Sequence, residues 1–186
     1  MTSVARKTVK EILKAAHDGH VEQLVDAVAD AATNGDQDRL HLLAKAAAQI
    51  ANGSLVANHA DDPINAPSAD GATPLFLAAK GGHLECTRIL LDARANVADA
   101  TSAGFTPLFV AALRGKSQVV CLLLEQYGVA VDQAAEDGRT PLYAACESGS
   151  VECVRALIGA GASLESRRSD DTTPLIVASY FGHAGV

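Results

Sequence analysis

The residues that could do chemistry are four cysteines and six histidines, and their spacing does not assemble a reactive site. No two cysteines form a Cys-x-x-Cys pair, and the histidines form no His-Glu-x-x-His motif, so neither a disulfide framework nor a zinc site is indicated. The sequence also lacks a Gly-x-Ser-x-Gly motif, a phosphate-binding glycine loop and a suitably spaced carboxylate pair. We therefore expect a chain that is not an enzyme and that uses no metal and no cofactor.

An internal repeat dominates the C-terminal part of the chain. Thr-Pro-Leu occurs four times, beginning at Thr73, Thr106, Thr140 and Thr173, at intervals of 33, 34 and 33 residues. A pair of small residues begins five positions after each Thr, and a glycine follows nine positions after it. Copies in register indicate a tandem array of one supersecondary unit, which cannot bury its apolar face alone and must stack on its neighbours.

Each copy predicts two helices separated by tight turns. The Thr hydroxyl is placed to cap the first helix, and the Pro after it takes the first helical position, where its missing N–H costs nothing. Gly82 then ends the first helix of its copy, and 83–91 is apolar at helical spacing. A glycine-containing hairpin turn, such as Asp137-Gly138, precedes the Thr of three copies. The fourth copy has Asp170-Asp171 instead, which predicts a looser hairpin.

The histidines and cysteines can now be placed within this unit. Histidine recurs at the start of the second helix, and cysteine stands where other copies carry small or apolar residues. The residues concerned are His20, His83 and His183, together with Cys86, Cys146 and Cys153. Recurrence at a packing position predicts a structural role rather than catalysis or metal binding.

The repeat resembles the ankyrin repeat family, most closely in Asp70-Gly71-Ala72-Thr73-Pro74-Leu75 and in Asp137-Gly138-Arg139-Thr140-Pro141-Leu142. The resemblance implies an all-α fold, an ankyrin-repeat solenoid of stacked helix pairs joined by short β-hairpin-like turns. One departure recurs in every copy. The residue after Thr-Pro-Leu is commonly His in the family, where it hydrogen-bonds to the Thr hydroxyl. Here we expect apolar stacking in its place, because the residues at this position are Phe76, Phe109, Tyr143 and Ile176.

We expect residues 1–186 to form a single solenoid. Its predicted parts are a degenerate first repeat at 8–33, an atypical helical repeat with a long loop at 34–67, full repeats at 68–100, 101–134 and 135–167, and an incomplete last repeat at 168–186. Three interpretations of the last repeat stay open. The chain is a fragment of a longer one, the half-repeat is itself a cap, or its apolar face pairs with another chain.

Charge and hydropathy narrow the range of partners. The chain has 15 Lys and Arg against 22 Asp and Glu, a formal charge of −7, and carries no basic cluster, so we expect no nucleic-acid partner. No apolar run approaches the roughly 20 residues of a membrane span, and the N-terminus shows no signal-peptide pattern. We therefore expect no membrane partner and a cytoplasmic location, with the nucleus as an open alternative. We expect the protein to be a monomer. The alternative is self-association through the incomplete last repeat.

The family resemblance implies a non-catalytic protein–protein interaction module that binds a partner protein through its hairpin tips and concave groove. The alternative is an interaction or regulatory domain of a larger polypeptide whose other part is an enzyme. Carried over by repeat position, the predicted partner-binding residues are Lys80, Phe105, Leu113, Arg114, Arg139, Glu147, Tyr180 and Phe181.

Within that set we expect the aromatic and arginine side chains to contribute most of the binding free energy. Aromatic residues make up only 4% of the chain, and aromatics and Arg are the types that dominate binding energy at interfaces. We expect the main patch to consist of Phe105, Leu113, Arg114 and Arg139. The structural alternative is that Phe105 packs on the adjacent hairpin, and that Tyr180 and Phe181 cover the neighbouring repeat.

Overall fold

The computed structural model describes residues 30, 31, 33, 34, 65, 67–92, 94–127 and 129–186. None of these residues lies in a β-strand. From residue 67 onward the helices are α4 (Pro74–Gly81), α5 (Leu84–Asp92), α6 (Pro107–Leu113), α7 (Ser117–Tyr127), α8 (Pro141–Ser148), α9 (Val151–Gly159) and α10 (Pro174–Tyr180). The predicted repeats at 8–33 and 34–67 lie almost entirely outside the described residues and stay predictions.

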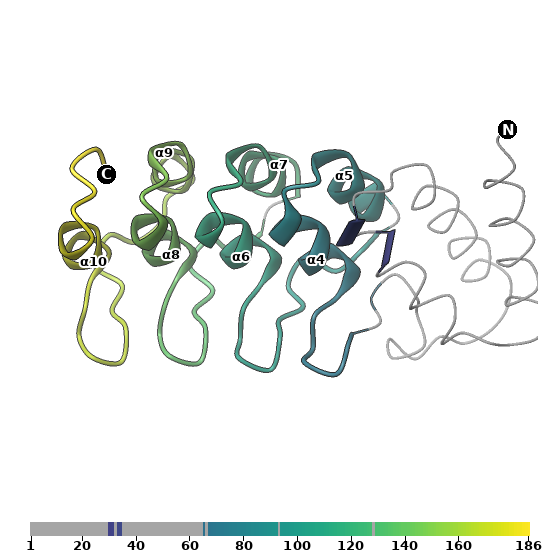
Figure 1. Cartoon of the computed structure of the whole chain (residues 1–186), viewed down its shortest axis with the longest axis horizontal. Coiled ribbons are helices and arrows are strands. Elements are labelled where there is room, and N and C mark those ends of the chain that lie inside the picture. Colours follow the sequence, from purple (N-terminus) through teal and green to yellow (C-terminus); the bar gives the residue numbers. More distant parts are fainter. Residues whose placement is uncertain (1–29, 32, 35–64, 66, 93, 128) are drawn as a thin grey trace, which may run out of the picture.

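The helices stack in two rows. The first helices of the repeats, α4, α6, α8 and α10, form one row, and the second helices, α5, α7 and α9, form the other (Figure 1). Four hairpins project from the first row, on the side away from the second helices (Figure 1). The helices α4, α6 and α8 each pack on their own second helix and on the first helix of the next repeat. This arrangement confirms the predicted all-α solenoid of helix pairs.

Each first helix begins at the predicted cap. The Thr106 hydroxyl accepts a hydrogen bond from the Phe109 backbone N–H at 3.1 Å, and the three other Thr residues make the same bond. Pro107 follows at the first helical position. Thr73, Thr106 and Thr140 are each 3% exposed, so water does not compete for these bonds. The cap fixes where the helix starts relative to the hairpin before it.

Glycine at the hairpin turn meets two requirements at once, as Gly104 illustrates. Its φ of +79° lies in the left-handed region, and its N–H donates to the Thr101 carbonyl at 2.8 Å. A Cβ added at Gly104 would lie 2.8 Å from the backbone nitrogen of Glu136 in the next hairpin. That nitrogen donates to the Ala103 carbonyl at 3.2 Å. The turn therefore needs glycine both for its own conformation and for the close approach of its neighbour.

The last hairpin closes as tightly as the others, so the prediction of a looser one is wrong. Asp171 takes the left-handed conformation, with φ +64°, and its N–H donates to the Arg168 carbonyl at 2.9 Å. The Arg168 N–H in turn donates to the Thr172 carbonyl at 3.0 Å, and the Asp170 carboxylate accepts from the Thr172 N–H. Asp is one of the few residues other than Gly that tolerate this conformation. The turn therefore keeps its geometry although Asp171 stands where the other hairpins have glycine.

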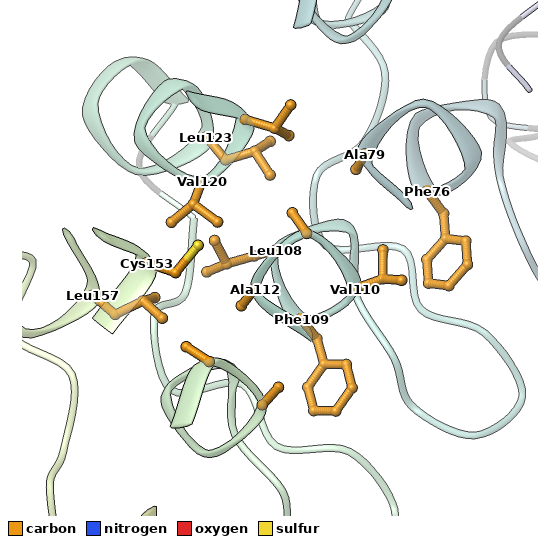
Figure 2. Close-up of a cluster of buried hydrophobic side chains, with 14 of the residues drawn as sticks. Phe76, Ala79, Leu108, Phe109, Val110, Ala112, Val120, Leu123, Cys153 and Leu157 are labelled. Carbon is orange, nitrogen blue, oxygen red and sulfur yellow. The ribbon is translucent and has the colours of Figure 1, made fainter. Parts of the chain in front are cut away.

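The core between the two helix rows is built mainly from alanine, leucine and valine side chains. The alanine pairs of α4, α6 and α8 are fully buried, so neighbouring first helices approach closely. Leu108 points from α6 into the same space as side chains from α7 and α9 (Figure 2). Those side chains are Val120, Leu123, Cys153 and Leu157.

The last described repeat buries less apolar surface than the others. Leu75, Leu108 and Leu142 are at most 1% exposed, but Leu175 at the same repeat position is 70% exposed. Ile176 is 54% exposed, whereas the equivalent Phe109 is buried. Within the described residues α10 packs on α8 and has no second helix beside it.

The two demands on the turn glycine can be separated by substitution. Gly161 has a φ of +88° and no atom within 4 Å of an added Cβ, so Gly161→Ala tests conformational strain alone. We expect it to lower the free energy of unfolding by about 1 kcal/mol. Gly104→Ala adds the clash with Glu136 and should cost at least about 1 kcal/mol more. Urea unfolding followed by circular dichroism measures both, and equal losses would show that the hairpins do not constrain one another.

Candidate functional site

The candidate residues come from two places in each repeat: the hairpin residue directly before the Thr, and the last turn of the first helix or the residue after it. We call the surface that they form the inner face. Its members are Ala72, Lys80, Phe105, Leu113, Arg114, Arg139, Glu147, Thr172, Tyr180 and Phe181. The two places meet in space, because the Arg139 guanidinium donates to the Glu147 carboxylate at 3.0 Å. The hairpin and the helix end therefore build one continuous surface.

Arg139 lies at the centre of a cluster that joins two repeats. Its Nε donates to Asp137 at 2.7 Å, and its Nη1 donates to Glu147. The guanidinium carbon lies 5.4 Å from the ring centroid of Phe105 and 5.5 Å from that of Phe109. Two carboxylates and two aromatic rings thus hold this cation in place, and only 19% of the side chain is exposed.

Phe105 packs on Phe109, the residue that replaces the histidine commonly found in the family. The two rings are stacked, with centroids 4.6 Å apart and an interplanar angle of 13°. Phe109 is 1% exposed and Phe105 is half-buried, so one ring anchors the other at the surface. The predicted apolar stacking at this position is confirmed for Phe109. Phe105 itself packs mainly on its own repeat, while the next hairpin supplies Arg139 above it.

The remaining candidates lie to either side of this cluster. Lys80 and Arg114 are exposed at the ends of α4 and α6, and Leu113 is half-buried against the core. At the other end Tyr180 is 82% exposed and Phe181 is 51% exposed, and their rings meet edge-on with centroids 5.2 Å apart. The structure therefore brings Phe105, Arg139 and Glu147 into one cluster. Leu113 and Arg114 lie at the end of α6 in the same repeat as Phe105, and the other candidates lie in other repeats.

Sequence reasoning missed two members of this surface. Asp137 contributes one of the two carboxylates that hold Arg139, although it stands out in the sequence only as a turn residue. Lys116 lies with its side-chain Cδ 2.6 Å from the position of a Cβ added at Gly82, so its stem covers the end of α4. His83 and His183 occupy the same repeat position as Lys116. This shared position could have identified Lys116 from the sequence as a residue that packs on the preceding repeat.

The recurrent histidines serve the stacking of repeats. His183 Nε2 lies 3.2 Å from the Glu147 carbonyl oxygen, and the ring covers Gly149 of the preceding repeat. His83 Nε2 lies 3.2 Å from the Thr33 carbonyl oxygen in the same way. The predicted structural role is confirmed for these two histidines, and His20 lies outside the described residues.

The cysteines are packing residues. Cys86, Cys146 and Cys153 are buried, as predicted. Burial raises the pKa of the Cys146 thiol to about 11 and raises the pKa of Cys153 as well, which suppresses the nucleophilic thiolate. In the described part of the chain no three His, Cys, Asp or Glu side chains gather as a metal site would require. No helix described there has the length and apolar character needed to cross a membrane.

Comparison with known protein families identifies a repeat family. A family model described as ankyrin repeats (3 copies) matches residues 28–135 and 127–186, well over half of the chain. No curated protein matches the sequence.

A double-mutant cycle on Arg139→Ala and Glu147→Ala measures how strongly the cluster links hairpin and helix. Because both side chains are mostly shielded and the bond is 3.0 Å long, we expect a coupling free energy of about 1 kcal/mol in urea unfolding. The control pair is Glu85 and Arg88 on α5, which are 3.5 Å apart and more exposed. It should give about 0.3 kcal/mol. Equal coupling free energies in the two cycles would contradict the claim that the Arg139–Glu147 pair links the hairpin to the end of α8.

Thiol labelling tests the burial of the cysteines. In the folded protein at about pH 8, Cys121 should react first with an aromatic disulfide reagent, because it alone of the four is partly exposed. Cys86, Cys146 and Cys153 should react only after denaturant is added. A second thiol that reacts as fast as Cys121, identified by mass spectrometry, would refute the described packing.

Proposed function

The chain belongs to the ankyrin repeat family, and from this premise we propose that it binds a partner protein through the inner face. Ankyrin repeats are generally protein–protein interaction modules, and the family is typically non-catalytic. In this proposal the binding residues are the predicted ones, with Phe105, Leu113, Arg114 and Arg139 at the centre and the others at the flanks.

The observation that carries the proposal is the half-buried ring of Phe105. It is stacked on a fully buried ring, and an arginine that two carboxylates fix in place lies about equally close to both rings. An aromatic side chain that is already immobile loses little entropy on binding, which favours a strong contact. Leu113 and Arg114 lie on the first helix of the same repeat and extend the contact surface.

The same surface would serve in two settings. The chain acts either as a free-standing interaction module or as the interaction domain of a larger polypeptide whose other part is an enzyme. In both settings we expect the contact residues to be the same, because they are fixed by the packing of repeats 101–134 and 135–167.

Selection from a random peptide library displayed on phage tests the proposal. Peptides selected on the wild-type chain are measured again on a Phe105→Leu/Arg114→Ala variant. We expect a loss of about 2 kcal/mol, or roughly thirtyfold in Kd, because both changes remove contacts at the centre of the surface.

The matched control is Arg88→Ala/Ile89→Val, which changes an arginine and an apolar residue on α5, in the row of second helices. Circular dichroism establishes that both variants fold. Unchanged affinity of the inner-face variant, or an equal loss in the control, would refute the proposed surface.

A further inference from the structure

The inner face carries two unneutralised positive charges at one end. Lys80 and Arg114 are exposed, and among the described residues neither forms an ion pair. Arg139, the other arginine of this face, is held by Asp137 and Glu147. In a protein with a formal charge of −7, these two cations without an ion pair lie on the candidate binding surface itself.

The inner-face positions beside these cations hold no carboxylate. The hairpin and helix positions of the α4–α6 part of the inner face hold Ala72, Gly81, Phe105 and Leu113, which are all uncharged. Glu147, the carboxylate of the next repeat, is engaged by Arg139.

The carboxylate at the hairpin tip, Asp70, is also engaged within its own turn. The Ser68 hydroxyl donates to it, and the Ala72 N–H lies 3.4 Å from it. These hydrogen bonds, more than the charge of Lys80, keep the pKa of Asp70 below its usual value. The Asp70 carboxylate is therefore satisfied by its hairpin and leaves the ammonium of Lys80 available.

Lys116 adds a third cation beside the first two. Its stem lies over Gly82, at the end of the helix that carries Lys80, and it follows Arg114 by two residues. It also forms no ion pair among the described residues. Three cations therefore lie at or just after the ends of α4 and α6, where Leu113 also lies.

We infer that the partner presents an acidic peptide segment, with its carboxylates against Lys80 and Arg114 and an apolar side chain against Phe105 and Leu113. The inference rests on the proposed function and specifies the chemistry of its partner. Arg114 can bind a carboxylate with two parallel hydrogen bonds, while Lys80 and Lys116 act as point charges. A nucleic acid is disfavoured, because three cations on a strongly acidic protein do not offset repulsion of a polyanion.

The test uses the peptides selected by phage display on the wild-type chain. We expect the selected sequences to be enriched in Asp and Glu next to an aromatic or aliphatic residue. One selected peptide, labelled with a fluorophore, is then titrated against the protein together with a version in which Asp and Glu are replaced by Asn and Gln. The amide version should bind about tenfold more weakly, and raising the salt concentration should weaken only the acidic peptide.

Variants of the protein give the reciprocal measurement. Lys80→Gln/Arg114→Gln should weaken the acidic peptide about tenfold and the amide version much less. The control, Arg94→Gln/Arg155→Gln, removes two exposed arginines outside the inner face and should change neither affinity. This comparison isolates the local cations from the overall charge, because both variants lose two positive charges.

The outcomes separate the two claims. If selected peptides lose affinity in the Phe105→Leu/Arg114→Ala variant but show no acidic enrichment and no salt dependence, the inference is overturned and the proposed function stands. If binding is insensitive to changes on the inner face, both are overturned. A single-stranded oligonucleotide that binds more tightly than the acidic peptide would also overturn the inference.

Discussion

The close approach of each hairpin to the next is the constraint on which the rest of the structure depends. Ser102, Glu136 and Ser169 donate their backbone N–H groups to carbonyls of the preceding hairpin, at 3.0, 3.2 and 2.9 Å. Such contact is possible because the turn residue facing it has no side chain, as the short distance from Gly104 to Glu136 shows. Because each threonine cap fixes its helix relative to the hairpin before it, the first helices have the same spacing as the hairpins. The buried alanine pairs allow the helices to pack at this short distance.

The inner face follows from this spacing. Successive hairpins lie side by side, so the residue before one Thr comes within reach of the residue before the next, and the Arg139 guanidinium lies over Phe105. The cap brings Phe109 beneath the same ring and sets Glu147 at the end of the following first helix. The same contacts that stack the repeats therefore also place the residues of the inner face. A cluster that links repeats is also rigid, which suits it to recognition.

The sequence predicts most features of the backbone within one repeat. The Thr cap was placed correctly in four described repeats, the helix-ending glycine in α4 and α8, and the glycine turn before the Thr in three repeats. Contacts of long side chains were harder to foresee, even within one repeat, because they depend on the rotamer. Arg139 was predicted as a partner contact, without the ion pairs that it forms with Asp137 and Glu147. The exchange of glycine for Asp171 was misjudged because the sequence does not reveal that this turn tolerates a side chain.

The central claim is that the inner face, built by the stacking of hairpins, is where a partner binds. Hydrogen–deuterium exchange of the chain, with and without a saturating selected peptide, tests it most directly. The account predicts that the peptide slows exchange in the hairpins 101–105 and 135–139 and at the ends of α6 and α8, and leaves α5, α7 and α9 unchanged. Protection confined to those second helices would contradict it.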